Sequence, residues 1–172
     1  MTVIVPLDTQ PHAALEQLLD AAFGPDRRAR TAYLIRTGMA QLPDLSFGLI
    51  DDQGKLIGSL QSWPVALTSA AGKQTPLIMV GPVAVAPSLQ REGHGRRLMD
   101  HAVAVARTRP GDPLMLIGDP EYYARFWGFS ADGTAGWRAP GPVDPRRLLA
   151  LSTNGAVIGG EGMLGPRVRA EA

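Results

Sequence analysis

The first 45 residues combine a short apolar run with two helical patterns. Val3–Leu7 is apolar and predicts an edge strand. After Thr9 and Pro11, leucine and alanine residues recur at helical spacing until Gly24, which predicts a helix that ends there. A second, weaker helical pattern covers Arg27–Arg36. This part of the chain is therefore expected to contain one strand followed by two helices.

The middle of the chain has the pattern of a hairpin followed by a central strand. Ser46–Ile50 and Leu56–Trp63 flank the turn Asp51–Gly54, which predicts two antiparallel strands. Small and polar residues predict a connection at Ser69–Thr75. Leu77–Ala86 is the most hydrophobic segment, and such a segment is expected at the centre of a sheet.

The remaining segments complete a mixed sheet. A long helix is predicted at about Gly95–Arg107, a buried strand at Leu114–Ile117 and a short helix at Pro120–Phe126. Strand-like pieces follow, notably Leu148–Ser152, and a loose tail is expected from Gly165. This order predicts an α/β (α+β) fold with a mixed, mostly antiparallel sheet flanked by helices. One parallel crossover is expected, from the central strand through the long helix to the buried strand.

Composition is typical of one soluble globular domain. The chain has 172 residues, of which 45% are hydrophobic and 19% charged. Cysteine is absent, which excludes disulfides, thiolate metal sites and a cysteine nucleophile, and no metal site is predicted. The start of the chain lacks the pattern of a signal peptide, and no apolar run reaches the roughly 20 residues that cross a bilayer. A cytoplasmic protein without a membrane partner is expected.

The charge balance argues against a nucleic-acid partner. Seventeen lysines and arginines face sixteen acidic residues, whereas nucleic-acid binders usually carry a clear basic excess. Arg91, Arg96 and Arg97 nevertheless lie close together in the sequence. Such a cluster on a nearly neutral chain suits a small anionic ligand, although solvated arginines on a helix surface have the same pattern.

The segment Gln90–Arg96 has the pattern of a phosphate-binding turn. It joins the predicted central strand to the long helix and contains Gly93 and Gly95. The first N–H groups of a helix lack intrahelical partners and carry about half a positive charge. Glycines let such a backbone close around an anion. The turn is therefore a candidate pyrophosphate site.

Two common phosphate motifs do not fit this turn. A Walker loop requires Gly-Lys-Ser or Gly-Lys-Thr, and the only lysines, Lys55 and Lys73, lie elsewhere. A dinucleotide fingerprint requires a third glycine three places after Gly95, where the chain has Leu98. A nucleotide-binding enzyme of another class is therefore disfavoured.

The spacing Gln90-x-x-Gly93-x-Gly95 resembles the Gln/Arg-x-x-Gly-x-Gly/Ala signature of the GNAT superfamily of acyl-CoA N-acyltransferases. Its position before an arginine-rich helix strengthens the resemblance. The segment Gly118–Phe129 and the glycine-rich end of the chain look most like the YhbS-like predicted acetyltransferases. The resemblance covers most of Ser46–Gly165, and residues 1–45 would be a variable N-terminal part of one domain spanning 1–172.

The resemblance implies that the chain binds acetyl-CoA as cosubstrate and transfers its acetyl group to an amine. The pyrophosphate would be held by the residues of the turn, which are Gln90, Arg91, Glu92, Gly93, His94, Gly95 and Arg96.

Gly81-Pro82 interrupts the predicted central strand. Because proline cannot donate to a ladder, a bulge is expected here that splays this strand from its parallel neighbour. The resemblance implies that the pantetheine arm pairs with the backbone of Val83, Ala84 and Val85. An amide near Ala84 or Val85 is also a candidate donor to an oxyanion. The alternative is an ordinary bulge that only shapes the strand and binds no ligand.

The resemblance also assigns roles to two tyrosines. Tyr123 would protonate the leaving thiolate, since a phenol with a pKa near 10 can donate at neutral pH, and Tyr122 would contribute to cofactor binding. The family tyrosine usually lies four residues before the glycine of Gly-Phe, whereas Tyr123 lies five before Gly128, as though Trp127 were inserted. We expect the helix end to absorb the extra residue. The alternative is that both tyrosines are partly buried residues that only pack within the fold.

No general base is evident in the sequence. The predicted central strand has no Asp, Glu or His, Asp119 before Pro120 is more typical of a helix N-cap, and Glu92 is expected to be solvated. Deprotonation through water, or an amine of low pKa, is therefore expected.

A small-molecule amine is the default acceptor, because the sequence has neither an acidic run nor a basic excess. A homodimer is left open by the family resemblance. The main rival hypothesis is a non-catalytic acyl-CoA-binding module or sensor, which the displaced Tyr123 and the missing carboxylate favour.

Overall fold

The computed structural model describes residues 1–168. Its helices and strands follow the order β1 (Val3–Pro6), α1 (His12–Phe23), α2 (Thr31–Ile35), β2 (Phe47–Ile50), β3 (Leu56–Thr68), β4 (Gln74–Val85), α3 (His94–Thr108), β5 (Leu114–Ile117), α4 (Pro120–Trp127), β6 (Trp137–Arg138), β7 (Leu148–Leu151) and β8 (Gly162–Pro166).

The strands form one mixed sheet. Its order is β1-β2-β3-β4-β5-β7, and β8 pairs with both β3 and β6. The pairs β1–β2, β2–β3, β3–β8 and β5–β7 are antiparallel, whereas β4–β5 and β6–β8 are parallel. The predicted mixed, mostly antiparallel sheet is confirmed, and so is the parallel crossover from β4 through α3 to β5. The parallel pair β6–β8 is an addition to the prediction.

The backbone divides into two compact units built from non-contiguous segments. The first contains residues 1–28, 41–62 and 80–109, and the second contains residues 29–40, 63–79 and the chain from 110 onward. Strands β3 and β4 contribute residues to both units. The expectation of a single domain stays a prediction.

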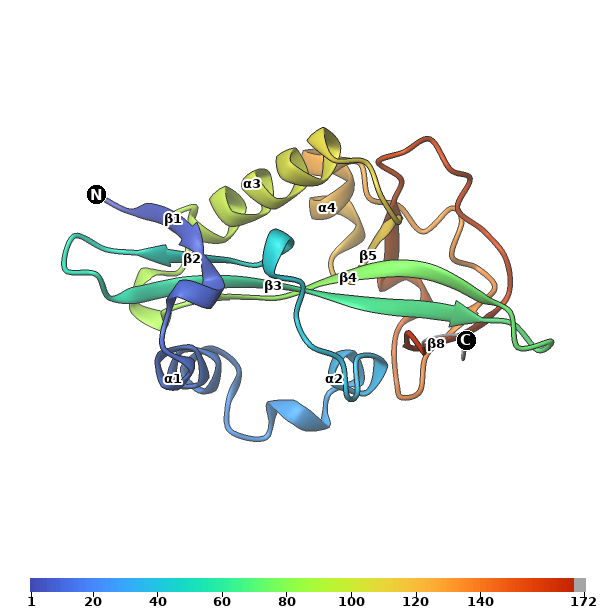
Figure 1. Cartoon of the computed structure of the whole chain (residues 1–172), viewed down its shortest axis with the longest axis horizontal. Helices are drawn as coiled ribbons and strands as arrows, with labels where there is room; N and C mark the ends of the chain where they lie inside the picture. The colour runs from blue at the N-terminus through green and yellow to red at the C-terminus, as the bar shows by residue number, and fades with distance from the viewer. Residues whose placement is uncertain (169–172) are drawn as a thin grey trace. The chain divides into compact units, whose positions relative to one another are not determined.

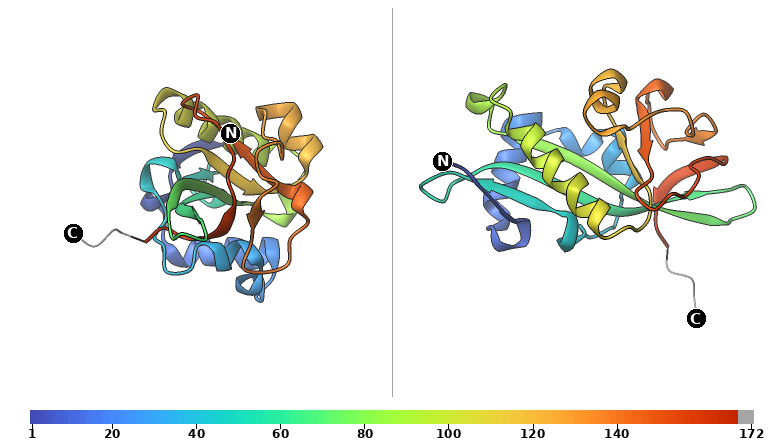
Figure 2. Two further views of the ribbon diagram at one scale, coloured as in Figure 1. Left: turned by 90° about the vertical axis from the view of Figure 1, so that its right-hand side faces the viewer. Right: turned by 90° about the horizontal axis from the view of Figure 1, so that it is seen from above.

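In the first unit, α1 and α3 cover opposite faces of the strands (Figures 1 and 2). The Phe47 ring of β2 meets the His101 ring of α3 edge-on, with 4.5 Å between the ring centroids. On the α1 face, a separate apolar cluster joins the helix to the strands, formed by Leu7, Leu15, Leu18, Leu19, Leu56 and Ala84. Residues on the two faces of β2, β3 and β4 therefore have different surroundings.

The core of the second unit is built on the far half of β3 and on β5, β7 and β8. It includes two tryptophans and otherwise mainly aliphatic side chains, namely Ile35, Trp63, Val65, Leu67, Leu77, Met79, Met115, Trp137, Leu148, Ala150 and Leu164. The parallel ladder between β4 and β5 joins Ile78 with Leu114 and Met79 with Met115. Gly81-Pro82, joined by a cis peptide bond, follows these pairs in β4. The predicted splay beyond that point stays a prediction.

The β3–β4 hairpin is longer than predicted. Strand β3 continues past Trp63 to Thr68, and β4 already begins at Gln74, within the segment expected to be a connection. The turn is closed by a hydrogen bond from the Ser69 N–H to the Lys73 carbonyl at 2.9 Å. Nearly all residues of β3 are buried, so the simple alternation of polar and apolar residues that marks a half-buried strand is missing.

The expectation of a loose tail from Gly165 is wrong for Gly165 and Pro166. Both lie in β8, where they pair with Ala66 and Val65 of β3. Glycine and proline are uncommon in strands, and this strand is held by backbone pairing at the side of β3. The last part of the expected tail, residues 169–172, lies outside the described residues.

A buried valine and an exposed valine of the second unit test this packing. Val65 is 0% exposed, whereas Val157 is 96% exposed. Val65→Ala is expected to lower the free energy of unfolding by about 2 kcal/mol, because it removes buried methyl groups and leaves a cavity. Val157→Ala should change it by less than about 0.5 kcal/mol. Denaturant unfolding of both variants measures the difference, and equal effects would contradict the assignment of Val65 to the core.

Candidate functional site

The predicted phosphate-binding turn lies between β4 and α3 in the first unit. Arg91 and Gly93 both have left-handed backbone conformations, with φ of 71° and 84°. Gly93 is the N-cap of α3 and has no side chain with which to accept hydrogen bonds from the first-turn N–H groups. The first turn of α3 contains no acidic residue. This helix end therefore presents unneutralised N–H groups and the positive end of the helix dipole.

Gly95 allows α3 to begin close to the end of β4. A Cβ atom at Gly95 would lie 3.7 Å from the Val85 side chain and 3.8 Å from that of Val83. Val83 and Val85 therefore face the start of α3, and any side chain beyond a methyl group at Gly95 would intrude between the helix and the strand. The structure thus brings the predicted pyrophosphate turn together with the predicted pantetheine strand.

The polar side chains of the turn differ in their surroundings. Gln90 donates from Nε2 to the Val85 carbonyl at 3.3 Å and ties the turn to β4. Arg91, Glu92 and Arg96 are exposed, whereas His94 is half-buried.

Arg97 of α3 is bonded to Thr2, the residue before β1. Its Nη1 donates to the Thr2 carbonyl at 3.1 Å and to the Thr2 hydroxyl. Arg97 is therefore engaged within the protein. This contact could not be predicted from the sequence, because Thr2 and Arg97 are far apart along the chain.

The predicted tyrosines lie on α4 in the second unit. Asp119 caps this helix and accepts hydrogen bonds from the N–H groups of Glu121, at 2.9 Å, and Tyr122, at 3.3 Å. The N-cap interpretation of Asp119 is therefore confirmed. Trp127 is the last residue of α4, and Gly128 ends the helix with a φ of 83°. That the helix end absorbs the extra residue, and that Tyr123 keeps its place relative to a thioester, both stay predictions.

Tyr123 is packed on several sides. Its ring centroid lies 5.2 Å from that of Tyr122, 5.5 Å from that of Trp127 and 6.1 Å from that of Phe129. A Cβ atom at Gly118 would lie 2.8 Å from Tyr123 Cδ2, so only glycine fits beneath the ring.

The surroundings of Tyr123 favour its neutral form. Burial raises the pKa of Tyr123 above its usual value of 10.0, and the charges of Tyr122 and Asp119 act in the same direction. Arg147 opposes the shift. The phenol therefore stays protonated throughout the neutral range and is available as a proton donor.

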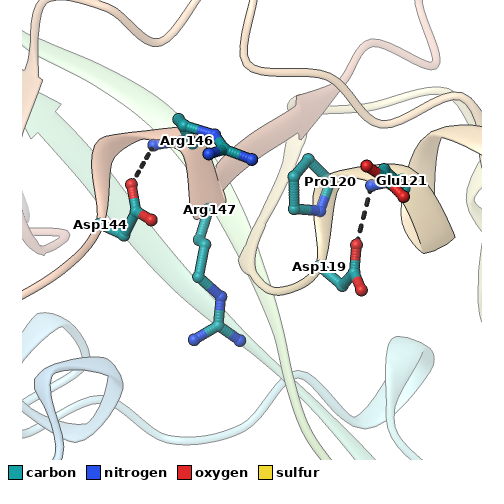
Figure 3. Close-up of a pocket in the computed structure, with 6 residues that line it drawn as sticks. All are labelled: Asp119, Pro120, Glu121, Asp144, Arg146 and Arg147. Carbon is teal, nitrogen blue, oxygen red and sulfur yellow. Dashed lines mark hydrogen bonds between the residues drawn. The ribbon is translucent and has the colours of Figure 1, made fainter.

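A pocket of about 370 Å³ opens at the start of α4 (Figure 3). Its lining is almost entirely charged and consists of Asp119, Pro120, Glu121, Asp144, Arg146 and Arg147. Asp144 accepts a hydrogen bond from the Arg146 N–H at 3.0 Å, and Arg147 donates from Nε to the Gly118 carbonyl at 3.4 Å. This pocket could not be predicted from the sequence, because its two halves come from segments that are separated along the chain.

Neither a metal site nor a membrane-spanning helix is found among residues 1–168. No three His, Asp or Glu side chains there lie together as a metal site would require. None of the helices in this part of the chain is long and apolar enough to span a membrane.

The fold and the turn together define a class of protein. A parallel strand–helix–strand crossover with a glycine-rich helix start, set in a mostly antiparallel sheet, is the arrangement that the GNAT resemblance implies. The family model described as "Acetyltransferase (GNAT) domain" matches residues 6–130. The chain belongs to this family of acetyltransferases.

Solved structures share the fold. The GNAT family N-acetyltransferase YhbS from Escherichia coli, in complex with CoA, is 21% identical, with a TM-score of 0.68 over 97% of this chain and 89% of that one. A GNAT family acetyltransferase from Brucella melitensis, in complex with acetyl-CoA, is 25% identical, with a TM-score of 0.62 over 94% and 93%. The ribosomal-protein-S18-alanine N-acetyltransferase from Escherichia coli is 20% identical, with a TM-score of 0.53 over 94% and 97%. No curated protein matches the chain in sequence.

The titration of Tyr123 tests its described surroundings. Because its folded-state pKa is raised, the phenol contributes stability that is complete below pH 10 and is lost as the pH rises through the folded pKa. The phenolate absorbance of the native protein should therefore include a phase above pH 10 that Tyr123→Phe removes. Tyr33→Phe, on α2, is the matched control. Loss of a phase at or below pH 10 in Tyr123→Phe would contradict the buried environment.

Proposed function

We propose that the protein transfers the acetyl group of acetyl-CoA to a small-molecule amine. The observation that carries this proposal is the start of α3, where Gly93 and Gly95 leave N–H groups open beside Val83 and Val85 of β4. An uncapped helix start next to a strand suits a ligand that has a pyrophosphate at one end and an amide-rich arm at the other. The CoA and acetyl-CoA complexes of the two similar GNAT proteins support the same ligand.

Each part of the cofactor has a proposed partner in the chain. The turn Gln90–Arg96 binds the pyrophosphate through its backbone N–H groups, and Arg91 and Arg96 add positive charge at its exposed side. The backbone of Val83, Ala84 and Val85 pairs with the pantetheine amides. Tyr122 contributes an apolar surface, since 38% of its side chain is exposed.

The reaction requires a free amine and a proton for sulfur. The amine lone pair attacks the thioester carbonyl carbon, and a backbone amide near Ala84 or Val85 donates to the oxyanion that develops. The carbon–sulfur bond then breaks, and Tyr123 donates its proton to the thiolate. The amine nitrogen loses a proton through water, which restores the phenol. The products are the acetylated amine and free CoA.

A non-catalytic acyl-CoA-binding module is the second candidate. The close packing of Tyr123 by Tyr122, Trp127 and Phe129 favours it, because a purely structural tyrosine would be packed in the same way. Such a module would bind acetyl-CoA and release no CoA with any amine. A cytoplasmic location and a homodimer stay predictions.

Ligand-dependent stability tests the cofactor. Acetyl-CoA at about 100 times its dissociation constant should stabilise the fold by about 2.7 kcal/mol, which raises Tm by about 5 to 10 °C, whereas ATP and NAD should not. Gly93→Ala should reduce the shift, because a Cβ atom is strained at a φ of 84°. Gly93→Asn is the matched control, since asparagine tolerates this conformation better. A larger shift with ATP or NAD would contradict the proposal.

Release of free CoA across a panel of amines tests transfer. Tyr123→Phe should lower kcat by about 100-fold, because the thiolate loses its proton donor, while the acetyl-CoA-dependent Tm shift stays. Tyr33→Phe should leave kcat unchanged. Full activity in Tyr123→Phe would remove this residue from the proposed role, and no CoA release from the native protein with any amine would favour the binding module.

A further inference from the structure

The charged pocket at the start of α4 has two walls of opposite charge. Its volume is about 370 Å³, and all of its lining belongs to the second unit. Arg146 and Arg147, directly before β7, supply the positive charges. Asp119 and Glu121, at the start of α4, supply negative charges on the other wall. Figure 3 shows the Arg146 side chain extending from its own wall toward the side on which Glu121 lies.

The opposite charges of the two walls are not paired with each other. Among residues 1–168, no ion pair joins an arginine of this pocket to one of its carboxylates, whereas Arg167 of the same unit pairs with Asp112 at 2.9 Å. Backbone contacts hold the walls in place instead, since Asp119 caps α4 and Asp144 accepts a hydrogen bond from the Arg146 N–H. Such a pocket suits a ligand that carries both charges.

Arg146 and Glu121 contribute their backbones to the local fold. The Arg146 N–H donates to Asp144 at 3.0 Å, and the Glu121 N–H donates to Asp119 at 2.9 Å. Both side chains are exposed, and within the described part of the chain neither guanidinium nor carboxylate is held by a hydrogen bond or an ion pair. Their charges are therefore open to a ligand, and either side chain can be replaced without loss of a hydrogen bond.

The pocket adjoins Tyr123 through Gly118. Arg147 donates from Nε to the Gly118 carbonyl at 3.4 Å, and a Cβ atom at Gly118 would lie 2.8 Å from Tyr123 Cδ2. The Tyr123 N–H also donates to the Asp119 carbonyl at 3.1 Å. The charges of Asp119 and Arg147 both act on the Tyr123 phenol. A ligand in the pocket would therefore lie beside the proposed proton donor.

The size and the charges of the pocket favour a small ligand. Ligand pockets span about 300–1,000 Å³, and this one is near the lower end of that range. A free amino acid has a suitable size, whereas a protein partner would need a much larger surface. The planar guanidinium of arginine matches a carboxylate, and the carboxylates of the other wall match an ammonium group.

We propose that this pocket binds the acceptor as a zwitterionic amino acid, an inference that rests on the proposed acetyl transfer. The Arg146 guanidinium donates to the carboxylate of the amino acid, and Arg147 adds positive charge. Glu121 and Asp119 accept hydrogen bonds from the ammonium group, which places the amine on the α4 side, next to Tyr123. The ammonium group loses one proton to water, which reaches these exposed side chains, and the free lone pair then attacks the thioester carbon. The products are an N-acetylated amino acid and CoA.

A panel of L-amino acids tests this site through release of CoA, together with the amide of the best acceptor, which keeps the amine and lacks the carboxylate. Arg146→Gln should raise the KM for the amino acid about 10-fold, because it removes charge-assisted hydrogen bonds to the carboxylate. The KM values for the amide and for acetyl-CoA should stay unchanged. Glu121→Gln should raise the KM for the amino acid and for the amide, since both carry the ammonium group. Each comparison uses one amine in two proteins, so the basicity of the amine cancels.

Two further variants separate binding from a purely structural role. Arg138→Gln is the matched control, because Arg138 is an exposed arginine of the same unit that does not line the pocket, and it should leave every KM unchanged. Arg146→Lys keeps the charge but loses the planar fork, so it should restore part of the affinity for the amino acid. If Arg146 only supported the fold, Arg146→Gln would lower Tm and affect the amino acid and its amide alike.

The remaining outcomes distinguish the site from the reaction. If other amines release CoA and amino acids do not, or if Arg146→Gln and Arg138→Gln behave alike, the amino-acid site is wrong while acetyl transfer stands. If acetyl-CoA raises Tm but no amine releases CoA, the proposed transfer fails. Calorimetric titration of the panel amino acids into the native protein and Arg146→Gln then tests the pocket alone, and absent or equal binding rejects it.

Discussion

The site depends on the close approach of α3 to β4 at Gly95. With no side chain there, the helix start packs directly against Val83 and Val85, and Gly93 turns the chain with a left-handed φ that most residues avoid. The helix dipole and its open N–H groups are thus held beside a strand in the same unit. A side chain larger than a methyl group at Gly95 would meet Val83 and Val85, and any side chain at Gly93 would strain the turn. The anion-binding proposal and the pantetheine proposal are therefore two consequences of one packing contact.

The two faces of the strands in the first unit have different surroundings. Side chains alternate along β3 and β4, so adjacent residues serve different sides of the sheet. Val83 and Val85 meet α3, whereas Ala84 meets the leucines of α1. One face of β4 therefore packs against the start of α3 and the other against the apolar side of α1, which fixes the strand from both sides.

Patterns within short windows of the sequence were enough to predict several elements of the fold. The α3 helix, the β5 strand and the turn at Gln90–Arg96 each follow from periodicity or glycine spacing within a short window, and the cap at Asp119 follows from the proline after it. Strand β8 was missed because its pairing with β3 compensates for glycine and proline, which disfavour strands on their own. The candidate site divides in the same way. The glycines of the turn were visible in the sequence, whereas the charged pocket at the start of α4 was not, because Asp119 and Arg147 come from segments that are separated along the chain.

Proton balance links the remaining features of the proposed reaction. Transfer of an acetyl group to an amine moves one proton from nitrogen to sulfur, so a base and an acid are usually needed. The chain has a neutral phenol whose pKa is raised by burial, and β4 has no carboxylate. A raised phenol pKa makes Tyr123 a weak acid toward a free thiolate, whose pKa near that of cysteine is about 8.5. The phenol is therefore most useful if it donates while the carbon–sulfur bond breaks, before a free thiolate has formed. On the nitrogen side β4 supplies no base, so the amine has to lose its proton to water or arrive uncharged.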